Sequence, residues 1–97
     1  MMENEQTRLH AIVEGRVQGV GFRAFVERNA SQLRITGWVR NRWDGTVEVT
    51  AEGDRATLDQ FLTTLRRGPS ASRVSQVKSQ WKPAIGEFNR FSIRYTV

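Results

Sequence analysis

Residues 15–23 of the chain are Gly15-Arg16-Val17-Gln18-Gly19-Val20-Gly21-Phe22-Arg23, and they stand between a strand pattern and a helix pattern. The three glycines let the backbone turn and approach a ligand closely, and their amides can point at one oxyanion. A helix that begins here adds unpaired N–H groups and the positive end of its dipole. Arg23 adds a planar guanidinium that matches phosphate or carboxylate. The stretch therefore predicts a bound anion.

An amphipathic strand and an amphipathic helix flank this turn. Residues 7–14 alternate between apolar and polar side chains and predict a half-buried strand. The single histidine, His10, falls on the polar face with no second ligand or nucleophile nearby, so we expect an ordinary sheet-face residue. Residues 22–33 carry apolar side chains at helical spacing and predict the first helix.

A hairpin follows. Residues 35–42 and 46–52 predict two antiparallel strands, and Asp44-Gly45 between them is a strong signal for a tight turn. Strand alternation places Asn41 on the face covered by the first helix and Arg40 on the other face.

A second helix and two further strands complete the chain. We expect a turn at Gly53, an N-cap at Asp54 and a helix whose apolar stripe spans residues 58–65, ended by Gly68-Pro69. Alternation predicts the last strands at residues 74–82 and 91–95, with a loop at residues 83–89 between them.

This order of elements predicts an α+β fold. It is the ferredoxin-like two-layer sandwich, βαββαβ plus a short C-terminal strand, with two helices on one face of an antiparallel sheet. We expect residues 1–6 to be a disordered N-terminus and residues 7–97 to form a single domain.

Composition narrows the possible functions. The chain has 97 residues, a net charge of +5, no cysteine and one histidine. Disulfides and thiolate metal sites are excluded, and with a single histidine no cluster of the usual metal ligands suggests itself, so we expect no metal. Neither a signal peptide nor an apolar run of about 20 residues is present, which favours a cytoplasmic protein that does not bind membranes. We also expect a monomer. The positive charge favours anionic partners.

The predicted topology brings Arg23 and Asn41 together. The first two strands run parallel with the third between them, so their C-terminal ends lie about 9–10 Å apart at one edge of the sheet. Arg23 can hold two oxygens of a small anion and the loop amides a third. Asn41, which is both donor and acceptor, can then position a water.

At these residues the chain resembles the acylphosphatases. The resemblance rests on residues 15–23, Gly37-Trp38-Val39-Arg40-Asn41, Asp44-Gly45, Val47-Glu48-Val49 and Ala51-Glu52-Gly53, and it covers nearly everything from Leu9 to Tyr95. It implies an enzyme that hydrolyses acyl phosphates to a carboxylate and inorganic phosphate without metal or cofactor. The catalytic residues implied are Arg23 and Asn41, and the phosphate-binding residues are Arg16, Val17, Gln18, Gly19, Val20, Gly21 and Arg23. One departure is Arg34, where relatives often have a glycine after the first helix, so the helix must close in a left-handed turn or end differently.

The residue types also suggest a mechanism. No carboxylate, His or Cys falls within the two signatures, so a side-chain base or nucleophile has no good candidate there. We therefore expect in-line attack by a water held by Asn41, with a phosphoryl oxygen of the substrate accepting the proton. Trp43 is the best tryptophan candidate for contact with an acyl group, although packing is the commoner role.

Three alternatives remain open. Gly19-Val20-Gly21-Phe22-Arg23-Ala24 fits a loose dinucleotide pattern, but the hairpin and the short chain do not make a doubly wound sheet. A small basic RNA-binding module has the same order of elements, yet residues 46–52 offer no aromatic ring to stack on a base. The third alternative is an accessory acylphosphatase-like module, of the kind found in larger hydrogenase-maturation carbamoyltransferases.

Overall fold

The first strand, β1 (Gln6–Arg16), buries the apolar side chains on one of its two faces. The structure is a computed structural model and describes residues 6–97. Leu9, Ala11 and Val13 are fully buried, and the residues between them lie on the open face of the sheet. The predicted disordered N-terminus lies outside the described residues apart from Gln6, which pairs with Asp54.

The strands form one sheet in the order β4-β1-β3-β2-β5. The remaining strands are β2 (Thr36–Asn41), β3 (Val47–Asp54), β4 (Arg73–Pro83) and β5 (Phe91–Ile93). Strand β3 pairs antiparallel with both β1 and β2, so β1 and β2 run parallel, as predicted. The α+β ferredoxin-like fold is confirmed with one correction. Because β5 pairs parallel with β2, the sheet is mixed and not wholly antiparallel.

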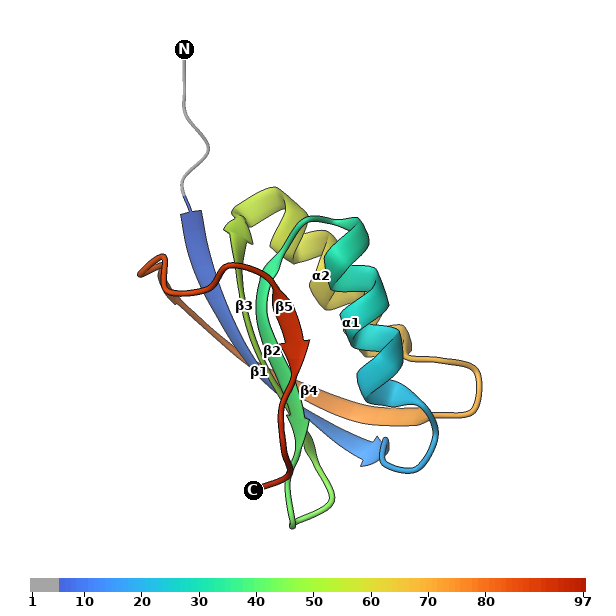
Figure 1. Cartoon of the computed structure of the whole chain (residues 1–97). Coiled ribbons are helices and arrows are strands. Elements are labelled where there is room, and N and C mark those ends of the chain that lie inside the picture. The colour runs from blue at the N-terminus through green and yellow to red at the C-terminus, as the bar shows by residue number, and fades with distance from the viewer. Residues whose placement is uncertain (1–5) are drawn as a thin grey trace.

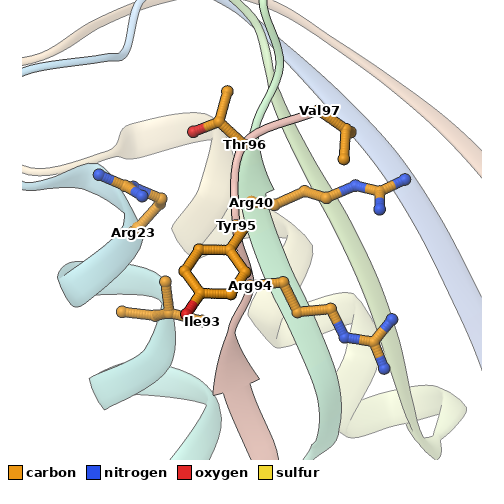
Figure 2. Close-up of a pocket in the computed structure, with 7 residues that line it drawn as sticks. All are labelled: Arg23, Arg40, Ile93, Arg94, Tyr95, Thr96 and Val97. Carbon is orange, nitrogen blue, oxygen red and sulfur yellow. The ribbon is translucent and has the colours of Figure 1, made fainter.

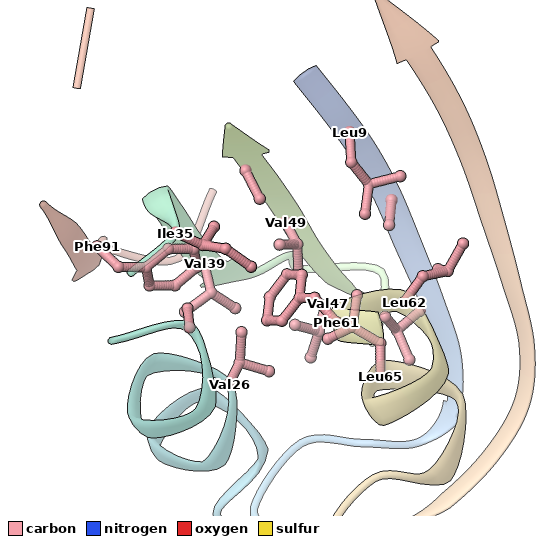
Figure 3. Packing of buried hydrophobic residues seen from close by; sticks show 14 of the residues in the cluster. Leu9, Val26, Ile35, Val39, Val47, Val49, Phe61, Leu62, Leu65 and Phe91 are labelled. Atoms are coloured by element: carbon pink, nitrogen blue, oxygen red, sulfur yellow. The ribbon is translucent and has the colours of Figure 1, made fainter. Parts of the chain in front are cut away.

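Both helices cover one face of this sheet (Figure 1). Helix α1 (Phe22–Gln32) packs on β2 and β5, and α2 (Arg55–Arg67) packs on β1, β3 and β4. Figure 3 shows apolar side chains from both helices meeting those of the strands in one core. The rings of Phe61 on α2 and Phe91 on β5 meet edge to face, with centroids 6.1 Å apart. This core fixes the ends of β1 and β2 relative to α1.

The start of α2 corrects one sequence prediction. Gly53 was expected to turn the chain, but it lies within β3 and pairs with Thr7 of β1. The strand therefore runs directly into the helix. Asp54 is the N-cap, as predicted, and its side chain accepts a hydrogen bond from the Thr57 N–H at 2.8 Å.

The end of α1 shows how the chain accommodates Arg34. Arg34 adopts a positive φ of 60°, and the N–H of Ile35 donates to the carbonyl of Ala30 at 2.9 Å. This is the left-handed closing turn that usually carries glycine. Arg34 therefore closes the helix in the left-handed turn that was one of the two expected outcomes.

The C-terminal segment is tied to β2 beyond the end of β5. Strand β5 is shorter than predicted, but Arg94 N–H donates to the Val39 carbonyl at 2.9 Å and Val97 N–H to the Asn41 carbonyl at 3.2 Å. Residues 94–97 therefore follow the strand that carries Asn41.

Candidate active site

A cavity of about 270 Å³ lies where β1 and β2 end and α1 begins. Five predicted site residues line it: Val17, Gly19, Gly21, Arg23 and Asn41. Its remaining walls are Phe22, Ala24 and Ile93. The fold thus brings together two sequence signatures that are separated along the chain.

The glycine turn leaves donors open on one side of this cavity. Gly19 and Gly21 have φ angles of 72° and 77°, which non-glycine residues rarely adopt. Gly21 is the N-cap of α1 and has no side chain to bond the first N–H groups, and no acidic residue lies in the first turn. The unpaired N–H groups and the helix dipole therefore favour an anion at this position.

Arg23 projects from the first turn of α1 and lines the cavity. Within residues 6–97 it forms no ion pair with a carboxylate. Arg40, on the other face of the sheet, contrasts with it, because its Nε donates to Glu48 at 2.8 Å. The guanidinium of Arg23 is available for an external anion.

Asn41 is the last residue of β2, and its backbone is held on both sides. It pairs with Val47 of β3, and its carbonyl accepts the N–H of Val97. Its side-chain Oδ1 is buried and has no hydrogen-bond partner in the described part of the chain. A buried acceptor without a partner costs roughly 1–3 kcal/mol, and such groups concentrate where a ligand or water binds.

Gln18 ties the glycine turn to the hairpin. Its Nε2 donates to the carbonyls of Arg42 at 2.7 Å and Thr46 at 2.9 Å. The side chain of Gln18 is thus turned toward the β2–β3 connection, and it fixes the distance between the two halves of the site. The predicted turn at Asp44-Gly45 is present, closed by a hydrogen bond from Gly45 N–H to the Arg42 carbonyl at 3.0 Å.

Three predicted phosphate-binding residues lie outside the walls of the cavity. They are Arg16, Gln18 and Val20. Arg16 is exposed at the end of β1 beside Arg73, and Val20 packs against the core. Their side chains therefore do not line the cavity, whose polar side chains are those of Arg23 and Asn41.

The family model for acylphosphatase matches residues 9–93 of the chain. The chain belongs to the acylphosphatase family. It is 50% identical over 84 residues to an acylphosphatase of Bacillus licheniformis, which covers 87% of this chain and 93% of the relative. The crystal structure of an acylphosphatase from Bacillus subtilis superposes with a TM-score of 0.89 at 40% identity, over 92% of this chain and 99% of the other.

The same fold also occurs inside a much larger protein. Full-length HypF, in a phosphate- and nucleotide-bound form, matches with a TM-score of 0.87 at 25% identity, over 98% of this chain but only 13% of that one. The family membership confirms the acylphosphatase enzyme class that the sequence signatures indicated.

The open face of the sheet argues separately against the RNA-binding alternative. Its central strand β3 presents Glu48, Thr50 and Glu52 on that face. Burial alone would raise the pKa of Glu48, but hydrogen bonds from His10 and Arg40 outweigh it and hold the pKa below its ordinary value. The carboxylate of Glu48 is ion-paired with Arg40. The side chains of β3 on this face therefore supply neither an aromatic ring for a base nor a cation for a phosphate.

Sequence reasoning missed the contribution of Ile93. The alternation of residues 91–95 gave its strand, but only the parallel pairing of β5 with β2 brings it beside Asn41. Trp43 lies at the hairpin and is 82% exposed, and the walls of the cavity do not include it. Neither helix within residues 6–97 is long and apolar enough to cross a membrane.

Proposed function

We propose that the chain hydrolyses the carboxyl–phosphate bond of acyl phosphates by direct attack of water on phosphorus. One observation is the strongest support for this proposal. The partnerless Oδ1 belongs to Asn41, and Asn41 lines the same small cavity as Arg23 and the glycine turn. The cavity therefore combines anion-binding groups with an acceptor for a water.

The two halves of the site take different roles. Arg23 binds two phosphoryl oxygens through its planar fork, and the N–H groups of the turn bind a third. Asn41 accepts a hydrogen bond from the attacking water and orients its lone pair toward phosphorus. Charge on the phosphoryl group in the transition state is stabilised by the guanidinium and the helix dipole.

The proton of the water goes to a phosphoryl oxygen of the substrate. The walls of the cavity, all within residues 6–97, offer no carboxylate, imidazole or thiol. A side-chain base or covalent nucleophile therefore has no candidate in reach. Because a carboxylate is a good leaving group, positioning and charge stabilisation can supply most of the acceleration.

Hydrolysis of acetyl phosphate in water enriched in heavy oxygen tests this proposal, with a chelator present throughout. We expect phosphate release by the wild type and label in the phosphate product, because the water attacks phosphorus. Label in acetate, a trapped phosphoenzyme or loss of activity with chelator would each contradict the mechanism. An Arg34→Gly variant, altered far from the cavity, serves as the control for handling and folding.

The predictions of a monomer and of a cytoplasmic location stand as predictions. A mass in solution near 11.1 kDa by light scattering would support the first.

A further inference from the structure

A small polar pocket lies at the end of α1 that is remote from the catalytic cavity. Figure 1 shows that the first turn of α1 is beside the glycine turn and that its last turn is at the opposite end of the sheet. There a pocket of about 260 Å³ lies between the end of α1, the start of β2 and the segment that leads into β5. Its volume is close to the 270 Å³ of the catalytic cavity, so it accommodates a group of similar size.

The side chains around this pocket are mainly hydrogen-bond donors. Two of the wall residues, Ile35 and Phe91, belong to the hydrophobic core. The other five are Ser31, Arg34, Thr36, Asn89 and Arg90. All five can donate hydrogen bonds, and the two arginines carry permanent positive charges. The walls, all within residues 6–97, include no carboxylate. This composition suits a small oxyanion.

Neither arginine of the pocket forms an ion pair with a carboxylate in the part of the chain that the structure describes. Glu87 precedes Arg90 in the same segment, but its Oε1 accepts from Arg8 at 2.6 Å. Glu52, which pairs with Thr36 across the sheet, accepts from Arg8 and from two backbone N–H groups. The acidic side chains nearest in the fold are therefore engaged elsewhere.

Arginines near the C-terminal segment are engaged in another way. The guanidinium groups of Arg40 and Arg94 lie over the ring of Trp38, at 4.4 Å and 5.0 Å from its centroid. Figure 2 shows both side chains extending away from Arg23, on the far side of that segment. Among the described residues, the two arginines of the pocket lie over no aromatic ring. In this respect they resemble Arg23, the arginine of the catalytic cavity.

The backbone of Arg34 is an independent observation that points to a ligand. Its φ of 60° lies in the left-handed region, which costs a residue with a Cβ roughly 1–2 kcal/mol. It is the one non-glycine residue with a positive φ within residues 6–97. Glycine would relieve this strain, and backbone strain of this kind clusters at sites that hold ligands. The strain is therefore explained if the guanidinium of Arg34 has a binding role.

The backbone acceptors at this end of α1 do not outweigh the two positive charges. The carbonyl of Ser31 already accepts the N–H of Arg34 at 3.1 Å, and the carbonyl of Arg90 accepts the N–H of Gly37 at 3.0 Å. The helix dipole places roughly half a negative charge at the C-terminal end. Two guanidinium groups leave the pocket with a net positive charge.

We propose that this pocket is a second anion site, which binds a phosphate ion between the guanidinium groups of Arg34 and Arg90. The hydroxyl of Thr36 and the amide of Asn89 donate to the remaining oxygens. The volume lies below the roughly 300–1,000 Å³ of pockets for larger ligands, so a small ion fits better than a nucleotide. The site takes no part in the reaction, and it does not depend on the proposed function.

Phosphate titrations of variants built on Arg23→Ala test the proposal. This background removes the arginine of the catalytic cavity, so the remaining binding reports the second site. Arg34→Gln and Arg90→Gln are each added to it. The matched control adds Arg28→Gln, which removes another exposed charge of α1 that lines neither the cavity nor the pocket. Chloride keeps the ionic strength constant, so general screening is the same throughout. Backbone amide signals in NMR spectra locate the site and give the dissociation constant.

We expect saturable shifts of the amide signals of residues 34–36 and 89–90 in Arg23→Ala. Adding Arg34→Gln or Arg90→Gln should raise the dissociation constant about tenfold or more, because each removes a charge-assisted hydrogen bond. Adding Arg28→Gln should change it less than about twofold. No saturable shift at these amides in Arg23→Ala, or equal weakening in all three double variants, would overturn the site. The titration contains no substrate, so its outcome is independent of whether the chain hydrolyses acyl phosphates.

Discussion

The neighbouring strands β2 and β3 each carry a buried polar side chain near their C-terminal end, and the two differ in their hydrogen bonding. At the end of β2, the Oδ1 of Asn41 has no partner within residues 6–97. At the end of β3, which points the other way, Glu52 is only 4% exposed and its carboxylate is fully engaged. It accepts from Arg8 Nε at 2.8 Å and from the N–H groups of Ile85 and Gly86 at 3.0 Å each.

Under the proposed mechanism, the difference separates groups that bind the substrate from groups that stabilise the fold. Glu52 fastens the loop before β5 to the sheet, and every bond it makes is internal. Within residues 6–97 the Oδ1 of Asn41 has no hydrogen-bond partner and Arg23 has no carboxylate partner. The buried Oδ1 without a partner costs stability, and both groups are available to a ligand. The same reasoning predicts opposite outcomes for substitutions at the two ends.

The largest effect is expected for Arg23→Ala. Loss of the guanidinium should lower kcat/KM about a thousandfold, with KM raised and kcat lowered, because the phosphoryl charge loses its main partner. The free energy of unfolding should stay the same or rise by about 0.5 kcal/mol, since a cation at a helix N-terminus is unfavourable. Steady-state kinetics and urea unfolding measure both. A large loss of stability with normal kinetics would show that Arg23 stabilises the fold and does not bind the phosphoryl group.

At the other end, Glu52→Gln should destabilise the fold without affecting catalysis. One carboxylate oxygen is replaced by an NH₂ group that faces N–H donors, so we expect a loss of about 2 kcal/mol in the free energy of unfolding. Below the unfolding transition, kcat and KM should match the wild type. Urea denaturation and steady-state kinetics check these outcomes, and altered kinetics in the folded variant would break the comparison.

The free energy of unfolding should depend on pH in a way that reports the same stabilising role of Glu52. Burial alone would raise its pKa, but the hydrogen bonds from Ile85, Arg8 and Gly86 outweigh it, so the pKa lies below its ordinary value of 4.5. A carboxyl with a lowered pKa stabilises the fold above that ordinary value, and the stabilisation is lost as the pH falls through the folded pKa. The wild type should therefore lose stability below about pH 4.5, and Glu52→Gln should lose less. Identical pH curves would contradict this role.

A smaller effect is expected for Gln18→Ala, which cuts the tie between the glycine turn and the hairpin. The cavity would keep its chemical groups but lose their spacing, so kcat/KM should fall about tenfold. Stability should fall by about 1 kcal/mol, because two hydrogen bonds to backbone carbonyls are lost. The exposed Gln80→Ala is the matched control. Unchanged kinetics in Gln18→Ala would show that the turn holds its position without this side chain.

The smallest effect is expected for Arg34→Gly. Arg34 has its positive φ at the end of α1 away from the catalytic cavity, so its strain does not contribute to catalysis. Glycine adopts this conformation without a Cβ, and we expect a gain of about 0.5–1 kcal/mol in the free energy of unfolding. Thermal unfolding in a buffer without phosphate would show it as a higher Tm, with kcat unchanged. A lower Tm would mean that the Arg34 side chain stabilises the turn.

Local patterns gave most of the fold. The alternation in β1, the stripe of α2 and the Asp44-Gly45 turn each follow from a short period or a single turn type, and the structure has them where the sequence indicated. The turn expected at Gly53 was wrong, because pairing with Thr7 of the neighbouring strand overrides the local preference of glycine.

The sequence predicted the part of the site that depends on where the first two strands end. Arg23 and Asn41 line one cavity because β1 and β2 are parallel, which the order of elements already implied. The contribution of Ile93 required the parallel pairing of β5 with β2, a long-range fact that no local pattern carries. The bonds of Gln18 to the hairpin were hidden for the same reason.

The most direct measurement compares kcat with the inhibition constant for inorganic phosphate in Asn41→Ala and in the wild type. If Asn41 aims the water and Arg23 with the turn binds the phosphoryl group, kcat should fall about a hundredfold while the inhibition constant changes less than about twofold. The variant should also unfold no more easily than the wild type. A kcat close to that of the wild type, or an inhibition constant that rises as much as kcat falls, would contradict the account.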